Sequence, residues 1–431
     1  MAGQQDGMNH EWDLLIHDAR CLDRSGRVDI GVRSGRIAAL APALEGHAAQ
    51  RIDARGGLVV RSFVEPHFHL DKCLSRARFG AVSFTEAFAR AREVKRNFTV
   101  ADVEERACRA LELAVAHGIG RMRAMVDVDF ATRLVSLEGV QRARERFARA
   151  IDIEIVAFPQ EGIVSDPEAP GLLADALGMG ADLLGGLPEF EASVADQKTH
   201  ILTVLDLAEK HGVGVDMHCD YTDDAAFKTL EMLADATIER GLEGRVVANH
   251  CNALSLYPDD EAKRVIDKLA AARIPIVVFP VANLQMLGGA KRTPYNRGSS
   301  RVKELLDAGV NVAAGADNMY DIWYRFNRMD PVEVALITCL SAGMRTDEEV
   351  REAFEMVTTR AARVLGRAET GIAEGASADM VVFEAGNLVD VLRNLPGRRI
   401  HIKNGRIVGG LDANVWCAGG PAERPAALGS G

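Results

Sequence analysis

The sequence predicts an α/β fold in which a (β/α)8 barrel carries a small β-domain built from both ends of the chain. Three observations predict it: the middle of the chain repeats a strand and then a helix eight times, both ends are rich in short strands, and polar residues stand where the predicted barrel strands end. An open, doubly wound sheet is the alternative. The polar residues favour the barrel, because barrel active sites lie at the carboxyl ends of the strands.

Residues 1–57 and 370–431 are predicted to form the small domain, a β-sandwich made of two segments. In the first segment short apolar runs such as Val28–Val32 alternate with glycine-containing turns, which is typical of a meander of strands. The same pattern returns at Asp379–Phe383, and Asn404-Gly405 is a dipeptide that favours a tight hairpin.

Residues 58–369 are predicted to form the barrel domain. Eight of its apolar runs are too short for helices and are expected to be strands: Leu58–Val64, Arg121–Asp129, Ile151–Phe158, Ala181–Leu187, Val213–His218, Arg245–His250, Ile274–Phe279 and Val310–Asp317. Helical patterns lie between and after them, among them Ala131–Ala150, Ser193–His211, Asp223–Arg240, Asp259–Ala271, 331–343 and 347–365. Eight such repeats imply a parallel sheet closed into a TIM-type barrel.

Composition excludes several classes of protein. The 431 residues are 48% hydrophobic and 26% charged, as in a soluble globular protein. The net charge of −11, from 51 basic and 62 acidic residues, argues against nucleic acid and anionic membranes as partners. The 7 cysteines, without a C-x-x-C pair, indicate reduced thiols. Without a signal-peptide pattern or an apolar run of about 18 residues, we expect a cytoplasmic protein.

Four histidines and one aspartate end four of the predicted strands. His67 and His69 point the same way, because residues i and i+2 of a strand share a face. His218, His250 and Asp317 end three further strands. Each alone has an ordinary structural explanation, such as a satisfied core histidine or a helix cap. Together, three imidazoles and a carboxylate at one barrel mouth suit a divalent transition metal with a position open for water.

This pattern resembles the amidohydrolase superfamily, and within it bacterial cytosine deaminase and its relatives. The similarity extends through Phe63–His67, Val156–Gly162 and His218–Asp220 to Asp317 and Trp323. It implies one divalent metal per chain, Zn²⁺ first and Fe²⁺ or Mn²⁺ as alternatives. The ligands it implies are His67, His69, His218 and Asp317. It also implies that Gln160 binds a heterocycle, that His250 acts at the reacting carbon, and that Trp323 lines the pocket.

The chain departs from cytosine deaminase at three positions. Tyr221 replaces the glutamate that moves protons, Asn318 replaces an aspartate, and Lys72 is additional. His69–Lys72 and Asp317-Asn318 look more like N-isopropylammelide isopropylaminohydrolase, the s-triazine-degrading branch. The resemblance therefore implies a hydrolase that cleaves a C–N bond of a small nitrogen heterocycle by metal-activated hydroxide, releasing ammonia or an alkylamine.

Proton transfer needs groups other than Tyr221, because a phenol with a reference pKa of about 10 is a poor base. Asp317 is expected to accept the proton of the attacking water, and Lys72 or Glu189 to deliver one to the leaving nitrogen. The predicted catalytic residues are therefore Asp317, His250, Lys72 and Glu189. The predicted substrate-binding residues are Gln160, Asn318, Trp323 and Tyr221.

Two other functions remain open. A ring-opening hydrolase of a cyclic amide, imide or urea would belong to the same superfamily, whose binuclear members use a carboxylated lysine after strand four. Here Gly185–Glu189 holds no lysine and the next is Lys198, so such an enzyme would be mononuclear. A ligand-binding protein without catalysis is the third possibility, suggested by the missing glutamate. The expected partners are a small heterocyclic substrate and further copies of the chain in a homo-oligomer.

Overall fold

The computed structural model describes residues 10–78, 84–287, 300–368 and 371–412. It divides into two compact units. The smaller unit holds the described residues up to Phe63, Val115–Gly120 and the described residues after Ala368, and the larger unit holds the rest. Within the described ranges, every helix is too short or too polar to cross a membrane.

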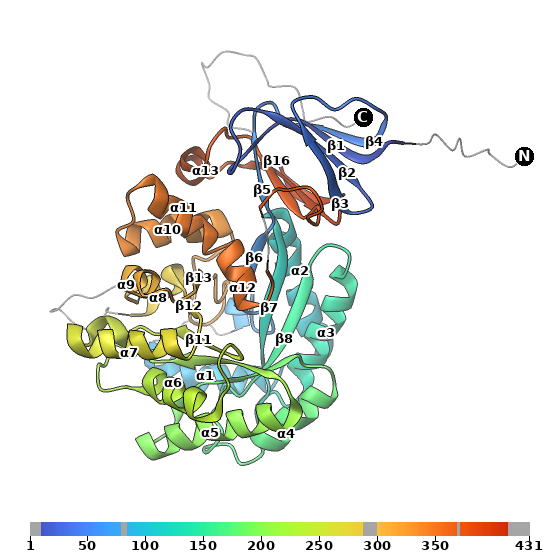
Figure 1. Ribbon diagram of the computed structural model, residues 1–431. Helices are drawn as coiled ribbons and strands as arrows, with labels where there is room; N and C mark the ends of the chain where they lie inside the picture. Colours follow the sequence, from blue (N-terminus) through green and yellow to red (C-terminus); the bar gives the residue numbers. More distant parts are fainter. Residues whose placement is uncertain (1–9, 79–83, 288–299, 369–370, 413–431) are drawn as a thin grey trace, which may run out of the picture. The chain divides into compact units, whose positions relative to one another are not determined.

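The larger unit is built around a parallel eight-stranded sheet, which confirms the predicted (β/α)8 fold (Figure 1). Its strands, in both chain and spatial order, are β6 (Phe63–His69), β7 (Ile119–Asp127), β8 (Asp152–Phe158), β9 (Leu183–Gly186), β10 (Gly214–Cys219), β11 (Val246–His250), β12 (Ile276–Val278) and β13 (Val312–Ala314). A parallel bridge between Phe68 and Asp317 brings the two ends of the sheet together. The amide of His69 donates to the carbonyl oxygen of Asp317 over 2.8 Å, so the ring of strands is nearly closed beside the first predicted ligands.

The first predicted strand, Leu58–Val64, is wrong in its bounds. The apolar run divides at Ser62 into two strands, β5 (Leu58–Arg61) and β6. β5 pairs with strands of the smaller unit, and only β6 enters the barrel. β5 and the first two residues of β6 are both mainly apolar, so hydrophobicity alone does not mark the division. As a result, His67 and His69 lie inside the barrel strand and not in the loop after it.

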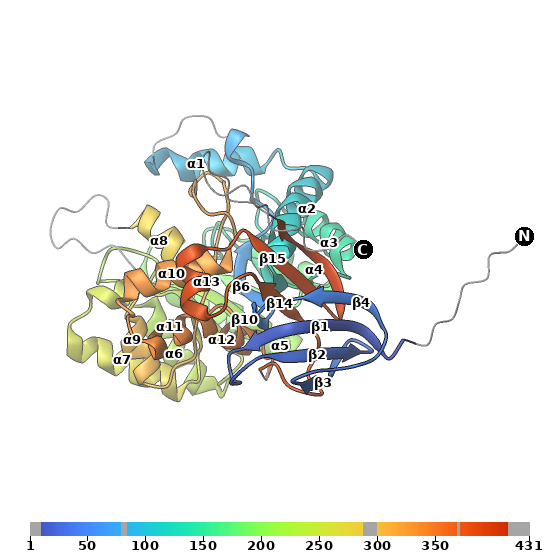
Figure 2. The same ribbon diagram turned by 90° about the horizontal axis from the view of Figure 1, so that it is seen from above.

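Helices follow the strands and lie outside them (Figures 1 and 2). They are α1 (Phe84–Lys95), α2 (Val100–Ala116), α3 (Val135–Phe147), α4 (Ala169–Gly178), α5 (Val194–His211), α6 (Thr229–Arg240), α7 (Asp259–Ala271), α8 (Pro280–Met286), α9 (Val302–Asp307), α10 (Pro331–Ala342), α11 (Asp347–Glu355) and α12 (Thr359–Val364), with short 3-10 turns at Arg76–Arg78, Pro188–Phe190 and Ala253–Leu256.

Four predicted helical segments show where the sequence pattern gives the bounds of a helix correctly and where it does not. α7 has the predicted bounds, and α5 begins where Ser193 caps the amide of Asp196. The helix predicted to begin at Asp223 instead begins at Thr229, where the buried Asp220 carboxylate accepts from the Leu230 amide and lies 3.0 Å from the Thr229 hydroxyl group. The pattern 347–365 is two helices, α11 and α12.

The smaller unit is one connected mixed sheet. Its strands are β1 (Trp12–Cys21), β2 (Val28–Arg33), β3 (Arg36–Ala41), β4 (Ala48–Asp53), β5, β14 (Met380–Phe383), β15 (Arg398–Lys403) and β16 (Arg406–Asp412), with the helix α13 (Leu388–Asn394) between β14 and β15. β1, β2 and β3 lie side by side (Figure 2).

Both ends of the chain contribute to the core of this sheet, as predicted. Leu14 and Ile30 from the N-terminal segment belong to the same buried cluster as Met380 and Ile402. The predicted hairpin turn joins β15 to β16 with φ of 49° at Asn404 and 72° at Gly405. Two successive positive φ angles are what a type I′ turn requires, and asparagine followed by glycine tolerates them best.

Candidate metal centre and substrate cavity

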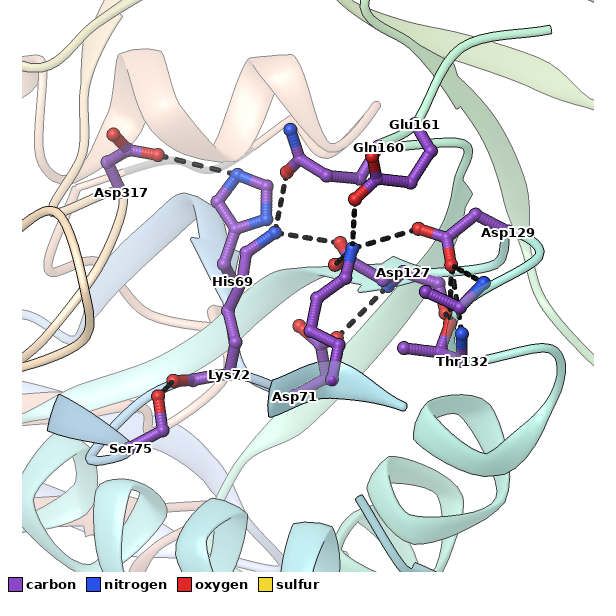
Figure 3. A network of polar contacts seen from close by, with 12 residues as sticks. His69, Asp71, Lys72, Ser75, Asp127, Asp129, Thr132, Gln160, Glu161 and Asp317 are labelled. Atoms are coloured by element: carbon purple, nitrogen blue, oxygen red, sulfur yellow. Dashed lines mark hydrogen bonds and ion pairs between the residues drawn. The ribbon is translucent and has the colours of Figure 1, made fainter. Parts of the chain in front are cut away.

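Four predicted site residues converge at the carboxyl ends of the barrel strands. Potential ligand atoms of His67, His218, His250 and Asp317 all lie within 4.8 Å of one another, and all four residues are buried. His69 joins them from β6, with its Nε2 3.6 Å from Oδ1 of Asp317 (Figure 3). The structure thus brings together the five donor residues that the sequence singled out.

Strand pairing and backbone conformation place these side chains. In the β10–β11 pair, His218 stands opposite Asn249 and Cys219 opposite His250, so the two histidines leave neighbouring strands almost level with each other. His250 and Asp317 both have left-handed backbone conformations, with φ of 66° and 67°. Such angles cost of order 1–3 kcal/mol in residues with a side chain and are typical of functional sites.

The electrostatics of the cluster favour a bound cation. Burial, followed by the charges of neighbouring groups, lowers the pKa of His69, His218 and His250, so the imidazoles are neutral at pH 7, the form that binds metals. Without a metal, burial raises the pKa of Asp317 to about 8, and a cation bound beside it would restore the ionised carboxylate at pH 7. Among the described residues, Nε2 of His67 and both carboxylate oxygens of Asp317 have no hydrogen-bond partner. A divalent metal ion fits this donor set, because it would satisfy these buried atoms at once.

Asp216 supports the cluster from behind and was missed by the sequence analysis. Its Oδ1 lies 3.5 Å from Nδ1 of His67, and it is held by Arg123 Nη1 at 2.7 Å and Asn249 Nδ2 at 2.5 Å. A carboxylate beside a ligating histidine fixes the orientation of the ring. A signal existed, because Asp216 and His218 occupy positions i and i+2 of one strand and therefore share a face.

Glu65 is a second residue that the sequence analysis did not assign to the site. Its buried carboxyl group accepts from the amide of Ala316 at 3.0 Å and from that of His67 at 3.2 Å. Burial raises its pKa to about 8. Glu65 thereby ties the chain just before Asp317 to the strand that carries His67. The signal was its spacing, because Glu65 lies two positions before His67 on the same strand and therefore shares its face.

Beside the histidines lies a cavity of about 110 Å³. It is small next to the roughly 300–1,000 Å³ of most ligand pockets, so only a small molecule fits. The predicted substrate-binding residues Gln160, Tyr221, Asn318 and Trp323 all line it. The rest of the lining consists of His69, Lys72, Leu187, Phe190, His218, His250, Leu287, Asp317 and Tyr324.

Tyr221 takes a structural position in this cavity. Its ring stacks on His250 with 3.8 Å between ring centroids and 24° between planes, and its hydroxyl group shares a hydrogen bond with that of Tyr324. Burial raises the pKa of the Tyr221 phenol, which makes it a weaker proton donor than a free tyrosine. The tyrosine therefore packs against His250 in the cavity wall, with its hydroxyl group held by that of Tyr324.

Glu189 is not brought into the cavity. The Thr229 hydroxyl group donates to its Oε1, and the same hydroxyl lies 3.0 Å from Asp220. Burial raises the pKa of Glu189 to about 8. The residue is absent from the cavity lining, so the geometry gives no support to its predicted catalytic role.

Lys72 lies in the cavity wall at the centre of a buried ionic network (Figure 3). Its Nζ donates to Oδ1 of Asp127 and to Oε1 of Gln160, each at 2.7 Å. The other oxygen of Asp127 accepts from Lys95 at 2.8 Å. His69, Asp71 and Asp127 form a second group whose spacing would suit a metal. Because both Asp127 oxygens already accept from ammonium groups, we assign no metal to this second group.

Comparisons with known proteins agree with this geometry. Residues 79–408 match the model of the amidohydrolase family. The chain is 29% identical to N-isopropylammelide isopropyl amidohydrolase of Pseudomonas sp. (strain ADP) over 93% of this chain and 98% of that one. It is 31% identical to pterin deaminase of Rhizobium rhizogenes (strain K84 / ATCC BAA-868) over 89% and 88%. The structure of 5-methylcytosine deaminase from Klebsiella pneumoniae liganded with 5-fluorocytosine superposes with a TM-score of 0.86 at 29% identity, covering 94% of this chain and 99% of that one.

Proposed function

Because the chain belongs to the amidohydrolase family, we propose that it is a metal-dependent aminohydrolase acting on a small nitrogen heterocycle. It cleaves a C–N bond and releases ammonia or an alkylamine. The observation that carries this proposal is the juxtaposition of buried, unpartnered donor atoms of His67 and Asp317 with the polar wall of a small cavity formed by Lys72 and Gln160.

His67, His69, His218 and Asp317 would hold one metal ion, with Zn²⁺ preferred over Fe²⁺ or Mn²⁺. When bound, such an ion lowers the pKa of a coordinated water to roughly 7 and so supplies a nucleophile at neutral pH. We assign His250 to the reacting carbon of the substrate and not to the metal. Its ring is held against Tyr221 on the cavity side, which supports this assignment.

Lys72, Gln160 and Asn318 provide the polar contacts to the heterocycle, and Trp323 and Tyr221 provide flat apolar surfaces around it. The small volume favours a single ring or a fused pair of rings. The named relatives support this substrate class, since their names specify N-isopropylammelide, a pterin and 5-methylcytosine.

Two side chains move protons in this proposal. A carboxylate oxygen of Asp317 accepts a proton from the attacking water, because it is buried at the edge of the cavity beside the histidines. The Lys72 ammonium group delivers a proton to the leaving nitrogen. We give this role to Lys72 and not to Glu189, whose carboxyl group is engaged by Thr229 outside the cavity lining.

We also propose a cytoplasmic location and a homo-oligomeric state. The cysteines among the described residues are free and buried, which suits a reducing compartment. Light scattering coupled to size-exclusion chromatography tests the oligomer, and a mass equal to 46.6 kDa would contradict it.

The function is tested by a screen of pyrimidines, s-triazines, pterins and cyclic ureas on zinc-loaded enzyme. We expect release of ammonia or an alkylamine from at least one compound, with the intact ring recovered by mass spectrometry. Recovery of an opened ring would favour the ring-opening alternative. His218→Ala serves as the control without catalysis. Absence of turnover on all four classes would contradict the proposal.

A further inference from the structure

Behind the cavity, four segments of the barrel meet in one buried ionic network. Lys95 at the end of α1 contacts three carboxylates, with its Nζ 2.8 Å from Asp127, 2.9 Å from Asp129 and 3.1 Å from Glu161. Lys95 is only 2% exposed and does not line the cavity. A buried ammonium group is stable only where carboxylates surround it, and Lys95 has three such neighbours.

Asp127 joins this network to the cavity. It ends β7, is fully buried and places one carboxylate oxygen on each of two ammonium groups, Lys95 and Lys72 (Figure 3). The Oδ2 of Asp71 accepts from its amide at 3.2 Å, so the backbone of Asp127 is also fixed. Two cations on opposite sides keep the carboxylate in one orientation.

The orientation of Lys72 sets that of Gln160. An ammonium group can only donate, so the 2.7 Å contact must be made by the amide oxygen of Gln160. The amide NH₂ group is then left for the cavity that Gln160 lines. Lys72 has three N–H groups, and its two acceptors leave one for the same cavity. Lys72 and Gln160 therefore offer only hydrogen-bond donors to the cavity.

We infer that Asp127 is a positioning residue, which holds Lys72 so that Lys72 and Gln160 together present a donor-only edge to the substrate. The inference rests on the proposed function and deepens it. A donor-only edge selects a heterocycle that offers acceptors there, namely a ring carbonyl oxygen or an unprotonated ring nitrogen. It disfavours rings that are protonated or carry only amino groups on that side.

Asp129 provides a matched control for Asp127. Both carboxylates contact Lys95 at nearly the same distance, 2.9 Å and 2.8 Å, but only Asp127 also contacts Lys72. The remaining oxygen of Asp129 accepts from the amides of Ala131 and Thr132, which an asparagine oxygen can also do. Asp127→Asn and Asp129→Asn therefore disturb Lys95 alike and differ in their effect on Lys72.

The test combines crystal structures and kinetics of both variants, prepared as full-length, metal-loaded protein. In Asp127→Asn we expect Lys72 Nζ to move beyond about 3.5 Å from Gln160 Oε1, outside hydrogen-bond range. We expect kcat/KM to fall by about tenfold or more, as the loss of a buried charged contact would. In Asp129→Asn the contact stays, and kcat/KM remains within about threefold. Metal content should not change in either variant.

An unmoved Lys72 in Asp127→Asn, or equal kinetic losses in both variants, would overturn the inference. If Asp127→Asn does not fold, Asp127→Glu retains the charge but moves the acceptor by one methylene group, and an unchanged kcat/KM would then count against the positioning role. The structural result decides the inference even where no substrate is found. A failed substrate screen would count only against the proposed function.

Discussion

The Lys72 ammonium group donates a 2.7 Å hydrogen bond to the side-chain oxygen of Gln160, and both residues line the same cavity. Gln160 therefore uses its acceptor on the protein and keeps its donors for a ligand. Gln160 can therefore have two roles, each with a different atom: its oxygen can hold Lys72, and its NH₂ group can bind substrate.

Gln160→Ala and Gln160→Glu together distinguish these roles. Gln160→Glu still offers an oxygen to Lys72 but removes the amide donors. If the donors bind substrate, both variants should lower kcat/KM by about tenfold or more, in line with about 1–3 kcal/mol for a buried polar contact. Steady-state kinetics with the substrate from the screen measures this. Activity retained in Gln160→Glu but lost in Gln160→Ala would restrict Gln160 to holding Lys72.

The metal centre makes a separate prediction. Protein purified without added metal should contain close to one equivalent of a divalent ion by elemental analysis, because a single cluster of unpartnered donors is assigned. His67→Ala should lower this value sharply, since His67 is among the proposed ligands. His250→Ala should retain the metal and lose activity.

A reproducible value near two equivalents, lost on Glu189→Ala, would contradict the mononuclear assignment. Retention of metal in His67→Ala together with loss in His250→Ala would exchange the roles given to these two residues, because both belong to the cluster of donors within 4.8 Å.

The barrel could be predicted because each strand and each helix is marked by its own local sequence pattern, and these patterns alternate along the chain. The convergence of His67, His218, His250 and Asp317 followed from the fold, since parallel strands carry their carboxyl ends to one side. The division of the predicted strand Leu58–Val64 at Ser62 was not predicted, because it depends on which distant strands β5 and β6 pair with.

The supporting residues were harder to find for the same reason. Lys95 lies on a helix whose sequence looks exposed, and its burial depends on Asp127, which ends β7, and on Glu161, which follows β8. Asp216 had a local signal in its spacing from His218, but its partner Arg123 lies 93 positions away. Glu189 was predicted to face the cavity from its place after a strand, and its contact with Thr229 is a tertiary one.

Glu191 predicts a specific acid sensitivity. Burial opposes its ionised form, but hydrogen bonds from His200 and from the amides of Ile163 and Val164 outweigh this and lower its pKa from 4.5 to about 2. The ionised carboxylate therefore stabilises the fold above pH 4.5, and this contribution is lost as the pH falls toward 2. Glu191→Gln should lower the free energy of unfolding by about 1–3 kcal/mol at pH 7.

Urea denaturation of the wild type and Glu191→Gln at several pH values checks this. The difference between them should shrink as the solution is made more acidic than pH 4.5. Glu168→Gln is the control, because Glu168 is 62% exposed and its ion pair with Arg133 should contribute no more than about 1 kcal/mol. A difference that is constant from neutral to acidic pH would rule out the charge of Glu191 as the cause.

The proton donor to the leaving nitrogen is the sharpest test of the mechanism, and Lys72 and Tyr221 are the residues to compare. Lys72→Met keeps an unbranched side chain between Phe158 and Trp323, each of whose rings lies 5.7 Å from the ammonium group. Asp127 still retains Lys95 as a counter-ion in this variant, so the fold and the metal should survive. We expect kcat to fall by about a hundredfold or more, the usual contribution of a positioned general acid.

In Tyr221→Phe the stacking on His250 remains and only the hydroxyl contact with Tyr324 is lost, so kcat should fall by less than about tenfold. Single-turnover measurements at saturating substrate separate this chemical step from product release. If Tyr221→Phe were the more damaged variant, the phenol would be the proton donor and Lys72 would serve only to bind substrate.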